Sequence, residues 1–344
     1  MGGPDEHLAP RAALLPRALS RASAVLRGTL VFALLLAACG QRKAVPTSGP
    51  VKEKPSVANS RAGSGASPST SSAKPKSEIS PAAEVGLGEA VVHVPSGLRP
   101  NEKVPLVVVL HGYGASSSAV ERFTDIESFA QSKRIAWIAP DGPKDKKGRQ
   151  FWNAGSSCCN FDGVAVDHVA ALRALVTRAL AWHPIDPKRV YFVGLSNGGF
   201  MAHRIACELG GLVAGVVSIA GAGRKPDEPC PATAPVRVLQ VQGDADDIVE
   251  IGGGHLFRDQ HYPTHLSAAQ TVSDWAKRFE CKPKPKAAGS IDFDAKLDGA
   301  ETSIQRFEGC KGGAIELWTV HGGSHYIGTR APAHEAMWKF LSGS

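Results

Sequence analysis

The chain has 344 residues, of which 43% are hydrophobic and 21% charged, and this length can hold one sizeable α/β domain or two small ones. Its formal net charge is +7, but residues 1–40 carry +2 and residues 41–80 carry +5, so residues 81–344 are neutral overall. A neutral domain without a basic stripe or a nucleic-acid-reading motif argues against nucleic acid as a partner.

The chain begins with a segment typical of an export signal. Four arginines precede the apolar stretch 29–38, which is too short to span a bilayer. The stretch leads into LAAC at residues 36–39, which resembles the lipobox of bacterial lipoproteins. That resemblance implies a signal peptide over residues 1–39, lipidation of Cys39 and attachment to a membrane through the lipid. Ordinary cleavage without a lipid is the alternative.

The segment after Cys39 has a different composition. Residues 40–84 are rich in Ser, Pro, Ala and Lys and contain few large apolar side chains. Such a segment cannot bury enough apolar surface to offset the entropy of ordering it, so we expect a disordered tether. The catalytic domain is then expected over residues 85–344.

Within residues 85–344, apolar runs typical of strands alternate with segments of helical periodicity. This order predicts an α/β domain with a mostly parallel sheet that is covered by helices. Strands are expected at 89–94, 104–110, 135–139, 189–193, 213–220, 236–241 and 315–320, and helices at 118–133, 166–182, 197–209, 268–279 and 333–341.

The motif GLSNG at residues 194–198 directly follows the apolar run 190–193 and precedes a helix-forming segment. A G-x-S-x-G motif between a strand and a helix is the signature of the nucleophile elbow of the α/β-hydrolase fold, in which a sharp turn exposes the serine. We therefore expect Ser196 to be the nucleophile; a plain glycine-rich turn is the structural alternative.

A serine nucleophile needs a base, and the base needs an acid that orients it. In this fold the acid and then the histidine follow the serine along the chain. The strand 236–241 leads into the loop that carries Asp244, Asp246 and Asp247, and the last strand leads into the loop that carries His321 and His325. Each loop therefore offers more than one candidate.

The oxyanion of the reaction needs backbone donors. In this fold one donor comes from the loop after an early strand and the other is the residue after the nucleophile. The motif LHGYG at residues 110–114 closes the first long apolar run. We expect the N–H groups of Tyr113 and Asn197 to be the donors, and His111 to brace the loop.

Six cysteines remain besides Cys39, an even number that favours three disulfides in an exported protein. Cys281 and Cys310 flank a segment before the last strand and form the best-supported pair. The remaining four are expected to pair among themselves, though not neighbour with neighbour at 158 and 159, because such bridges are strained. A bridge from either neighbour to position 207 would hold the active-site loop. No cysteine spacing indicates a metal site. The six are Cys158, Cys159, Cys207, Cys230, Cys281 and Cys310.

From about residue 88 onward the chain resembles the polyhydroxybutyrate depolymerase and feruloyl/acetylxylan esterase family of α/β-hydrolases. The resemblance implies that Asp246 is the acid and His325 the base, with Asp244 and His321 as alternatives. The sequence of this chain departs from the family pattern at Gln242, Asp244, His168 and Tyr326. The matching motifs are LHGYG at 110–114, WN at 152–153 before CC at 158–159, VD at 166–167, Asp186 with RVY at 189–191, GLSNGGFMA at 194–202, Gly243 with Asp246, and GSH at 323–325.

The resemblance implies an exported serine esterase that works through an acyl-enzyme and needs no cofactor. Its substrate is expected to be an ester, either a hydroxyalkanoate oligomer or an esterified polysaccharide fragment. Trp152 is the candidate substrate-facing aromatic, with packing under its loop as the alternative. A second enzymatic hypothesis is acyl transfer or peptide cleavage by the same residues. A non-enzymatic hypothesis is a catalytically silent lipoprotein that uses the fold for binding.

Overall fold

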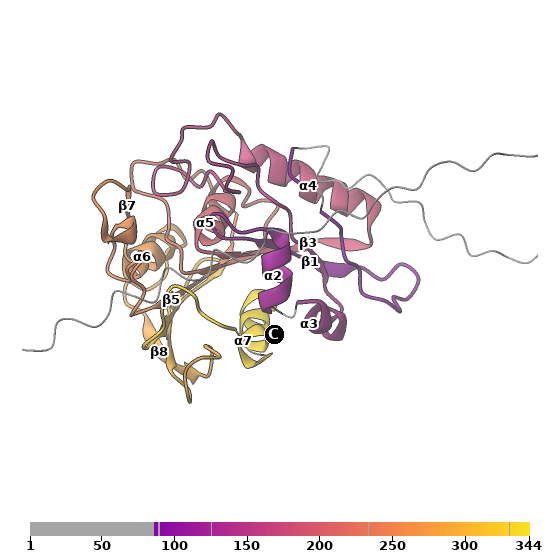
Figure 1. Cartoon of the computed structure of the whole chain (residues 1–344). Coiled ribbons are helices and arrows are strands. Elements are labelled where there is room, and N and C mark those ends of the chain that lie inside the picture. Colours follow the sequence, from indigo (N-terminus) through magenta and orange to yellow (C-terminus); the bar gives the residue numbers. More distant parts are fainter. Residues whose placement is uncertain (1–85, 89, 125, 233, 330) are drawn as a thin grey trace, which may run out of the picture. The chain divides into compact units, whose positions relative to one another are not determined.

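The computed structural model describes residues 86–344, apart from residues 89, 125, 233 and 330 (Figure 1). The chain divides into two units, Met1–Ser71 and Ser72–Ser344, and the described residues all belong to the second. The predicted signal peptide, Cys39 and the tether lie outside the described residues. Among the helices that are described, none is long and apolar enough to cross a membrane.

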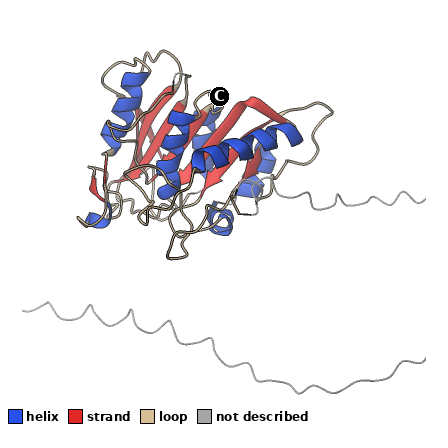
Figure 2. Ribbon diagram, turned by 90° about the horizontal axis from the view of Figure 1, so that it is seen from above, coloured by secondary structure: helices blue, strands red, loops and turns tan. Residues whose placement is uncertain are grey.

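An eight-stranded sheet forms the centre of the domain (Figure 2). The six strands from β2 to β10 run parallel, and β9 and β8 are added antiparallel at one edge. Parallel strands are covered on both faces, which explains why the run VPLVVVL of β1 is buried throughout. In spatial order the strands are β2 (Ala136–Ile138), β1 (Val104–Leu110), β3 (Ile185–Leu195), β4 (Gly215–Ile219), β5 (Arg237–Gly243), β10 (Ala314–Val320), β9 (Thr302–Arg306) and β8 (Lys286–Ile291).

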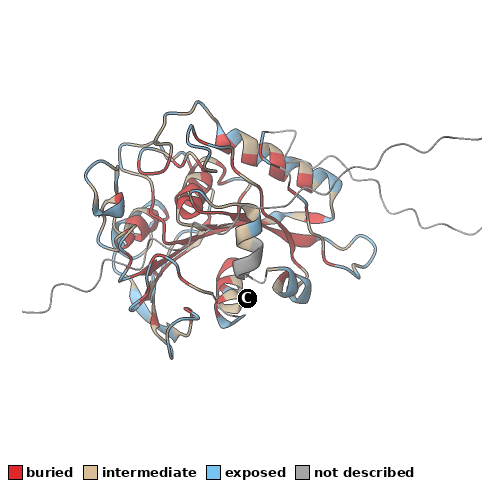
Figure 3. Ribbon diagram, in the orientation of Figure 1, coloured by how far each residue is buried: buried red, intermediate tan, exposed pale blue. Residues whose placement is uncertain are grey.

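Helices cover both faces of this sheet, and the segments of the helices and strands that face each other are coloured as buried (Figures 1 and 3). Alternate residues of one strand serve opposite faces: Val108 packs towards the first helix layer and Val107 and Val109 towards the second. The first layer comprises α4 (His168–Trp182), α5 (Asn197–Glu208) and α6 (Ala268–Arg278); the second comprises α2 (Ser117–Thr124), α3 (Ile126–Lys133) and α7 (Ala331–Ser342).

The α/β-hydrolase fold predicted from the sequence is confirmed, with three local differences. The helix expected over 118–133 is two helices, α2 and α3. Of the strand expected over 89–94, the described residues show only a bridge between His93 and Trp137. Strands β8 and β9 were missed, because their side chains are mostly polar or exposed and carry little apolar periodicity. A small two-stranded sheet, β6 (Gly254–His255) with β7 (Thr264–His265), and a 3₁₀ turn, η1 (Leu256–Arg258), complete the described elements.

The described residues form three disulfides, and two of them differ from the sequence expectation. Cys281 is bonded to Cys310, the pair expected. Cys207 is bonded to Cys230, and the neighbours Cys158 and Cys159 are bonded to each other. The expectations that the neighbours do not pair and that one of them bridges to Cys207 are therefore wrong. The physical reason is that Cys230, on the segment after β4, lies next to Cys207: the Cα atoms of the two cysteines are 4.7 Å apart.

Candidate active site

Ser196 lies at the sharp turn between β3 and α5. Its backbone has φ 54° and ψ −119°, a conformation that is strained for a residue with a side chain and that clusters at functional sites. The turn closes because Gly194 and Gly198 lack a Cβ: one added at Gly194 would collide with the backbone of Gly198, and one added at Gly198 with the backbone of Leu110. The N–H of Ser196 donates to Ile219 O at 2.8 Å, which ties the turn to β4.

The side chains of the predicted triad lie in the order Ser196, His325 and Asp246 in the structure, each within hydrogen-bonding distance of the next. His325 Nε2 lies 2.9 Å from Ser196 Oγ, and His325 Nδ1 lies 2.8 Å from Asp246 Oδ2. The side chains of His325 and Asp246 are 6% and 0% exposed. Along the chain, His325 lies 129 positions after Ser196 and 79 positions after Asp246. The three residues meet because the loops that carry them follow parallel strands whose ends lie at one edge of the sheet.

The carboxylate of Asp246 accepts four hydrogen bonds. Its Oδ1 accepts from the backbone N–H groups of Ile248 at 2.9 Å and Val249 at 2.8 Å. Its Oδ2 accepts from His325 and from Gln242 Nε2 at 2.9 Å. Hydrogen bonds to the charged form of a buried carboxylate offset the cost of burying it. Gln242, one of the departures from the family pattern, therefore provides a donor to the acid.

A buried hydrogen-bonded chain extends behind the acid into the first helix layer. Trp275 Nε1 donates to His203 Nδ1 at 3.2 Å, so His203 carries its proton on Nε2 and donates to Gln240 Oε1 at 2.8 Å. Gln240 Nε2 donates to Gln242 Oε1 at 3.1 Å, and Gln242 donates to Asp246. Burial lowers the pKa of His203 to about 4, so its imidazole stays neutral at neutral pH. Along this series of hydrogen bonds, each donor from Trp275 to Gln242 donates in the direction of Asp246.

The two expected oxyanion donors flank the serine. Asn197 is the first residue of α5, and the first N–H groups of a helix have no acceptor within it. A Cβ on Gly112 would lie 3.5 Å from Ser196 Cβ, which places the loop of Tyr113 beside the elbow. The hydroxyl of Tyr113 donates to Asp145, whose pKa stands at about 2, since hydrogen bonds outweigh the opposing effect of burial.

His111 braces the loop, as expected. It is buried, its Nδ1 lies 2.8 Å from Gly112 O, and its Nε2 accepts from Gly142 N at 3.0 Å. With an acceptor at Nε2, the ring carries its proton on Nδ1 and donates it to the loop that precedes Tyr113. Burial lowers the pKa of His111, which favours this neutral form.

Trp152 does not face a substrate, so that prediction is wrong. Its side chain is fully buried, and its Nε1 donates to His111 O at 3.0 Å. Its backbone N–H donates to Asn197 Oδ1 at 2.7 Å, and its carbonyl accepts from Asn197 Nδ2 at 2.8 Å. The indole is buried because a ring with one polar atom packs under the loop once that atom has an acceptor. Asn197 thus holds the active-site loop, the role that the sequence assigned to a disulfide.

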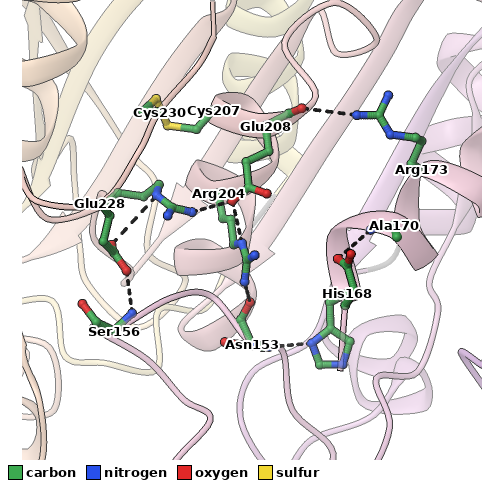
Figure 4. Close-up of polar contacts among 12 residues, drawn as sticks. Asn153, Ser156, His168, Ala170, Arg173, Arg204, Cys207, Glu208, Glu228 and Cys230 are labelled. Atoms are coloured by element: carbon green, nitrogen blue, oxygen red, sulfur yellow. Dashed lines mark hydrogen bonds and ion pairs between the residues drawn. A yellow bond between two sulfur atoms is a disulfide. The ribbon is translucent and has the colours of Figure 1, made fainter. Parts of the chain in front are cut away.

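Charged side chains behind this loop clamp it further (Figure 4). Arg204 on α5 donates to Asn153 O at 2.7 Å and to Glu208 at 2.8 Å, and the N–H of Ser156 donates to Glu228 at 2.6 Å. The backbone N–H of Asn153 also donates to His168 Nδ1 at 2.6 Å. Burial, together with the charge of Arg204, lowers the pKa of His168 to about 4.

The alternative acid and base pair with each other, away from Ser196. His321 Nδ1 lies 2.9 Å from Asp244 Oδ2, and His321 Nε2 lies 2.9 Å from Ser303 Oγ. Burial raises the pKa of Asp244, but hydrogen bonds from His321 and from the backbone N–H of Gly322 outweigh this effect and hold the pKa below its usual value. We name Asp244, His321 and Ser303 the outer set, and Asp246, His325 and Ser196 the inner set.

Neither Ser303 nor the hydrogen-bonded chain from Gln242 to Trp275 was predicted from the sequence. Ser303 lies on β9, which was itself not predicted, and the buried chain joins residues that are far apart in sequence. No local motif marks either one. In the described part of the chain, no group of three or more His, Cys, Asp or Glu side chains is arranged to hold a metal ion.

The fold and the elbow define this protein as an α/β-hydrolase. The model of the phospholipase/carboxylesterase family matches residues 92–273, more than half of the chain, and the chain belongs to that family. The resemblance to polyhydroxybutyrate depolymerases and feruloyl/acetylxylan esterases that the motifs indicated is confirmed, because the chain is similar to curated proteins with these names.

Three similar proteins carry esterase names. The chain is 27% identical to feruloyl esterase B of Piromyces equi over 70% of its own length and 43% of that protein. It is 27% identical to the putative esterase NocK of Nocardia uniformis subsp. tsuyamanensis over 64% of each chain. The match thus spans less than two thirds of either relative. The solved structure of an acetyl xylan esterase from Aspergillus awamori covers 78% of this chain and 97% of its own, with a TM-score of 0.53 and 14% identity, a likeness of fold.

Proposed function

We propose that this protein hydrolyses carboxylic esters through an acyl-enzyme on Ser196. The observation that carries the proposal is the unbroken hydrogen-bonded path from Ser196 Oγ through His325 to Asp246. A serine hydroxyl becomes a nucleophile when a histidine accepts its proton and a carboxylate orients that histidine. The esterase names of the relatives support the same chemistry.

The reaction follows in two balanced halves. Ser196 Oγ attacks the ester carbonyl carbon while His325 Nε2 takes the hydroxyl proton, and the resulting oxyanion accepts from the N–H groups of Tyr113 and Asn197. The tetrahedral intermediate collapses, and the alcohol leaves with the proton from His325. A water molecule then gives a proton to His325 and attacks the acyl carbon. Ser196 leaves, recovers that proton, and the acid is released.

Each supporting residue has a defined task in this proposal. Asp246 holds the Nδ1–H tautomer of His325 and stabilises the imidazolium that forms. Gln242 and two backbone donors hold Asp246, so the carboxylate keeps one orientation. Loss of one oxyanion donor in such a site costs about 2.7–4 kcal/mol of transition-state stabilisation.

For the substrate, the names of similar proteins point to feruloyl esters and acetylated xylan. The motif resemblance adds hydroxyalkanoate oligomers. The shared chemistry is an ester of a carboxylic acid, and we take that class as the substrate. A panel of acetyl, feruloyl and 3-hydroxybutyrate esters compares these acyl groups directly.

The test is covalent labelling. A fluorophosphonate probe should label the wild-type chain, mass spectrometry should place the label on Ser196, and Ser196→Ala should lose both the label and the hydrolysis of short p-nitrophenyl esters. Absence of label and of hydrolysis in the wild type would favour a silent binding lipoprotein. Transfer of the acyl group to an added alcohol in preference to water would identify an acyltransferase.

Export and lipid anchoring at Cys39 complete the proposal. The lipobox-like sequence before Cys39 and the three disulfides support it, because disulfides persist in oxidising compartments. In a bacterial host the wild-type protein should fractionate with membranes and carry a diacylglyceryl mass on Cys39. The Cys39→Ala variant should appear in the soluble fraction, and equal membrane association of both would contradict the anchor.

A further inference from the structure

A cavity of about 570 Å³ opens at the inner set and extends away from it between the sheet and the second helix layer. Ser196 and His325 line one part of it. The rest is lined by β1, β3, α2, α3 and α7, including Val107, Val109 and Val193 from the strands and Phe129, Met337 and Leu341 from the helices. We propose that this cavity binds an unbranched, apolar acyl chain of about eight carbons in the substrate ester.

This inference rests on the proposed function and narrows its acyl group. The cavity is continuous with Ser196, so an acyl chain that enters it can remain attached to the carbonyl carbon that Ser196 attacks. Along β1 the lining runs from Val107 to Leu110, about 10 Å at roughly 3.3 Å per residue, which accommodates an extended octanoyl chain. An acetyl group would leave most of this apolar surface uncovered.

The lining offers little to a polar acyl group. Several of the polar side chains that border the cavity already have partners: the Lys296 ammonium donates to Tyr326 O, and Thr329 Oγ1 lies 2.9 Å from His334 Nε2. A phenol or a second ester group in such surroundings would lose its hydrogen bonds to water. The lining therefore favours a saturated chain over a feruloyl group or a hydroxyalkanoate oligomer.

Two exposed aromatic side chains border the same cavity. Tyr326, directly after His325, is 66% exposed, and Phe257 is 42% exposed. Phe257 has φ 60° and Arg258 has φ 55°, and such strained backbone clusters at ligand clamps. These rings give an apolar chain an apolar surface to contact as it enters from solvent.

The test compares p-nitrophenyl acetate, butyrate, octanoate and dodecanoate with methyl ferulate, using the purified full-length chain. We expect kcat/KM for the octanoate to exceed that for the acetate at least ~100-fold, because each buried methylene contributes about a factor of four. A flat profile, or a preference for acetate or ferulate, would overturn this inference and leave the proposed esterase activity intact. Hydrolysis of none of the esters would overturn both.

A filling variant tests the position of the chain. Val193 lies three residues before Ser196, about 10 Å along the strand, and its side chain lines the cavity. Val193→Phe should lower the ratio of octanoate to butyrate hydrolysis at least tenfold, and an unchanged ratio would contradict the inference. Val91→Phe is the matched control, because Val91 is 63% exposed and is not part of the lining; it should keep the wild-type rates.

An enlarging variant covers the case in which Val193→Phe does not fold. Val193→Ala removes two methyl groups from the same wall and should shift the preference from octanoate towards dodecanoate. Thermal unfolding curves of all three variants show whether each is folded. A folded Val193→Ala protein with the wild-type chain-length profile would overturn the inference.

Discussion

Two sets of Ser, His and Asp lie on neighbouring parts of this molecule with nearly equal spacing. In the inner set the imidazole lies 2.8 Å from its carboxylate and 2.9 Å from its hydroxyl; in the outer set both distances are 2.9 Å. The two aspartates are two residues apart on one loop, and the two histidines are four residues apart on another. Spacing alone therefore does not identify an active site.

The surroundings separate the two sets. The side chains of His325 and Asp246 are 6% and 0% exposed, whereas those of His321 and Asp244 are 57% and 38% exposed. Water screens the outer interactions, while the inner ones lie in a medium of lower dielectric constant, where they are stronger. Ser196 also stands on a strained turn at the start of a helix, whereas Ser303 lies within a strand.

The largest expected effect comes from deleting each hydroxyl in turn. Ser196→Ala should lower kcat for a p-nitrophenyl ester at least ~10⁴-fold, as removal of the nucleophile does in triads. Ser303→Ala should stay within about twofold of the wild type, because Ser303 lies inside β9 between β8 and β10 and not at the start of a helix whose N–H groups could bind an oxyanion. Steady-state kinetics on both variants decide this, and a larger loss in Ser303→Ala would assign the nucleophile to the outer set.

The next effect comes from the two acids. Asp246→Asn should lower kcat about 10³–10⁴-fold, because an amide can donate to His325 Nδ1 and so favour the wrong tautomer. Asp244→Asn is the matched substitution in the outer set and should leave kcat within about twofold. Circular dichroism controls for folding in both, and equal losses in the two variants would contradict the distinction between the sets.

A smaller effect is expected from Gln242, whose side-chain amide donates a hydrogen bond to the acid of the inner set. Gln242→Glu places a second carboxylate beside Asp246, and two carboxylates in one site share a proton, which raises the apparent pKa of the pair. The protonated pair does not orient His325, so the acid limb of the pH profile of kcat should move up by about one unit or more. Gln242→Met removes the donor without adding charge and should lower kcat about tenfold with the acid limb unmoved. An unshifted limb in Gln242→Glu would show that residue 242 does not act on Asp246.

The smallest effect concerns stability. The pKa of His203 is lowered from 6.5 to about 4 by burial, so between these values the unfolded chain binds a proton that the folded chain does not. The free energy of unfolding should therefore fall as pH drops from 6.5 towards 4, and His203 should contribute on the order of 2 kcal/mol to that fall. Urea unfolding at pH 7 and pH 4.5 measures the fall, which should be smaller in His203→Gln. His321→Gln, in the exposed outer set, should show the wild-type fall; a fall equal in all three proteins would contradict the assignment to His203.

Much of this protein was predictable from local patterns. The apolar runs predicted the parallel strands, because strands that are buried on both faces need apolar residues at every position. The glycines at 194 and 198 predicted the turn at Ser196, because only glycine leaves room for the backbone that passes there. The polar hairpin of β8 and β9 was not predictable, because its stability comes from pairing with β10 and not from its own composition.

The choice between two aspartates and two histidines lay beyond the residues alone. Asp244 and His321 stand on the same loops as Asp246 and His325, and family motifs were needed to prefer the latter. The burial of Trp152, the pairing of Cys158 with Cys159 and the hydrogen-bonded chain behind Asp246 likewise appear only in three dimensions. Local sequence determines which backbone turns can form, whereas the packing of distant segments determines which side chains lose water and meet.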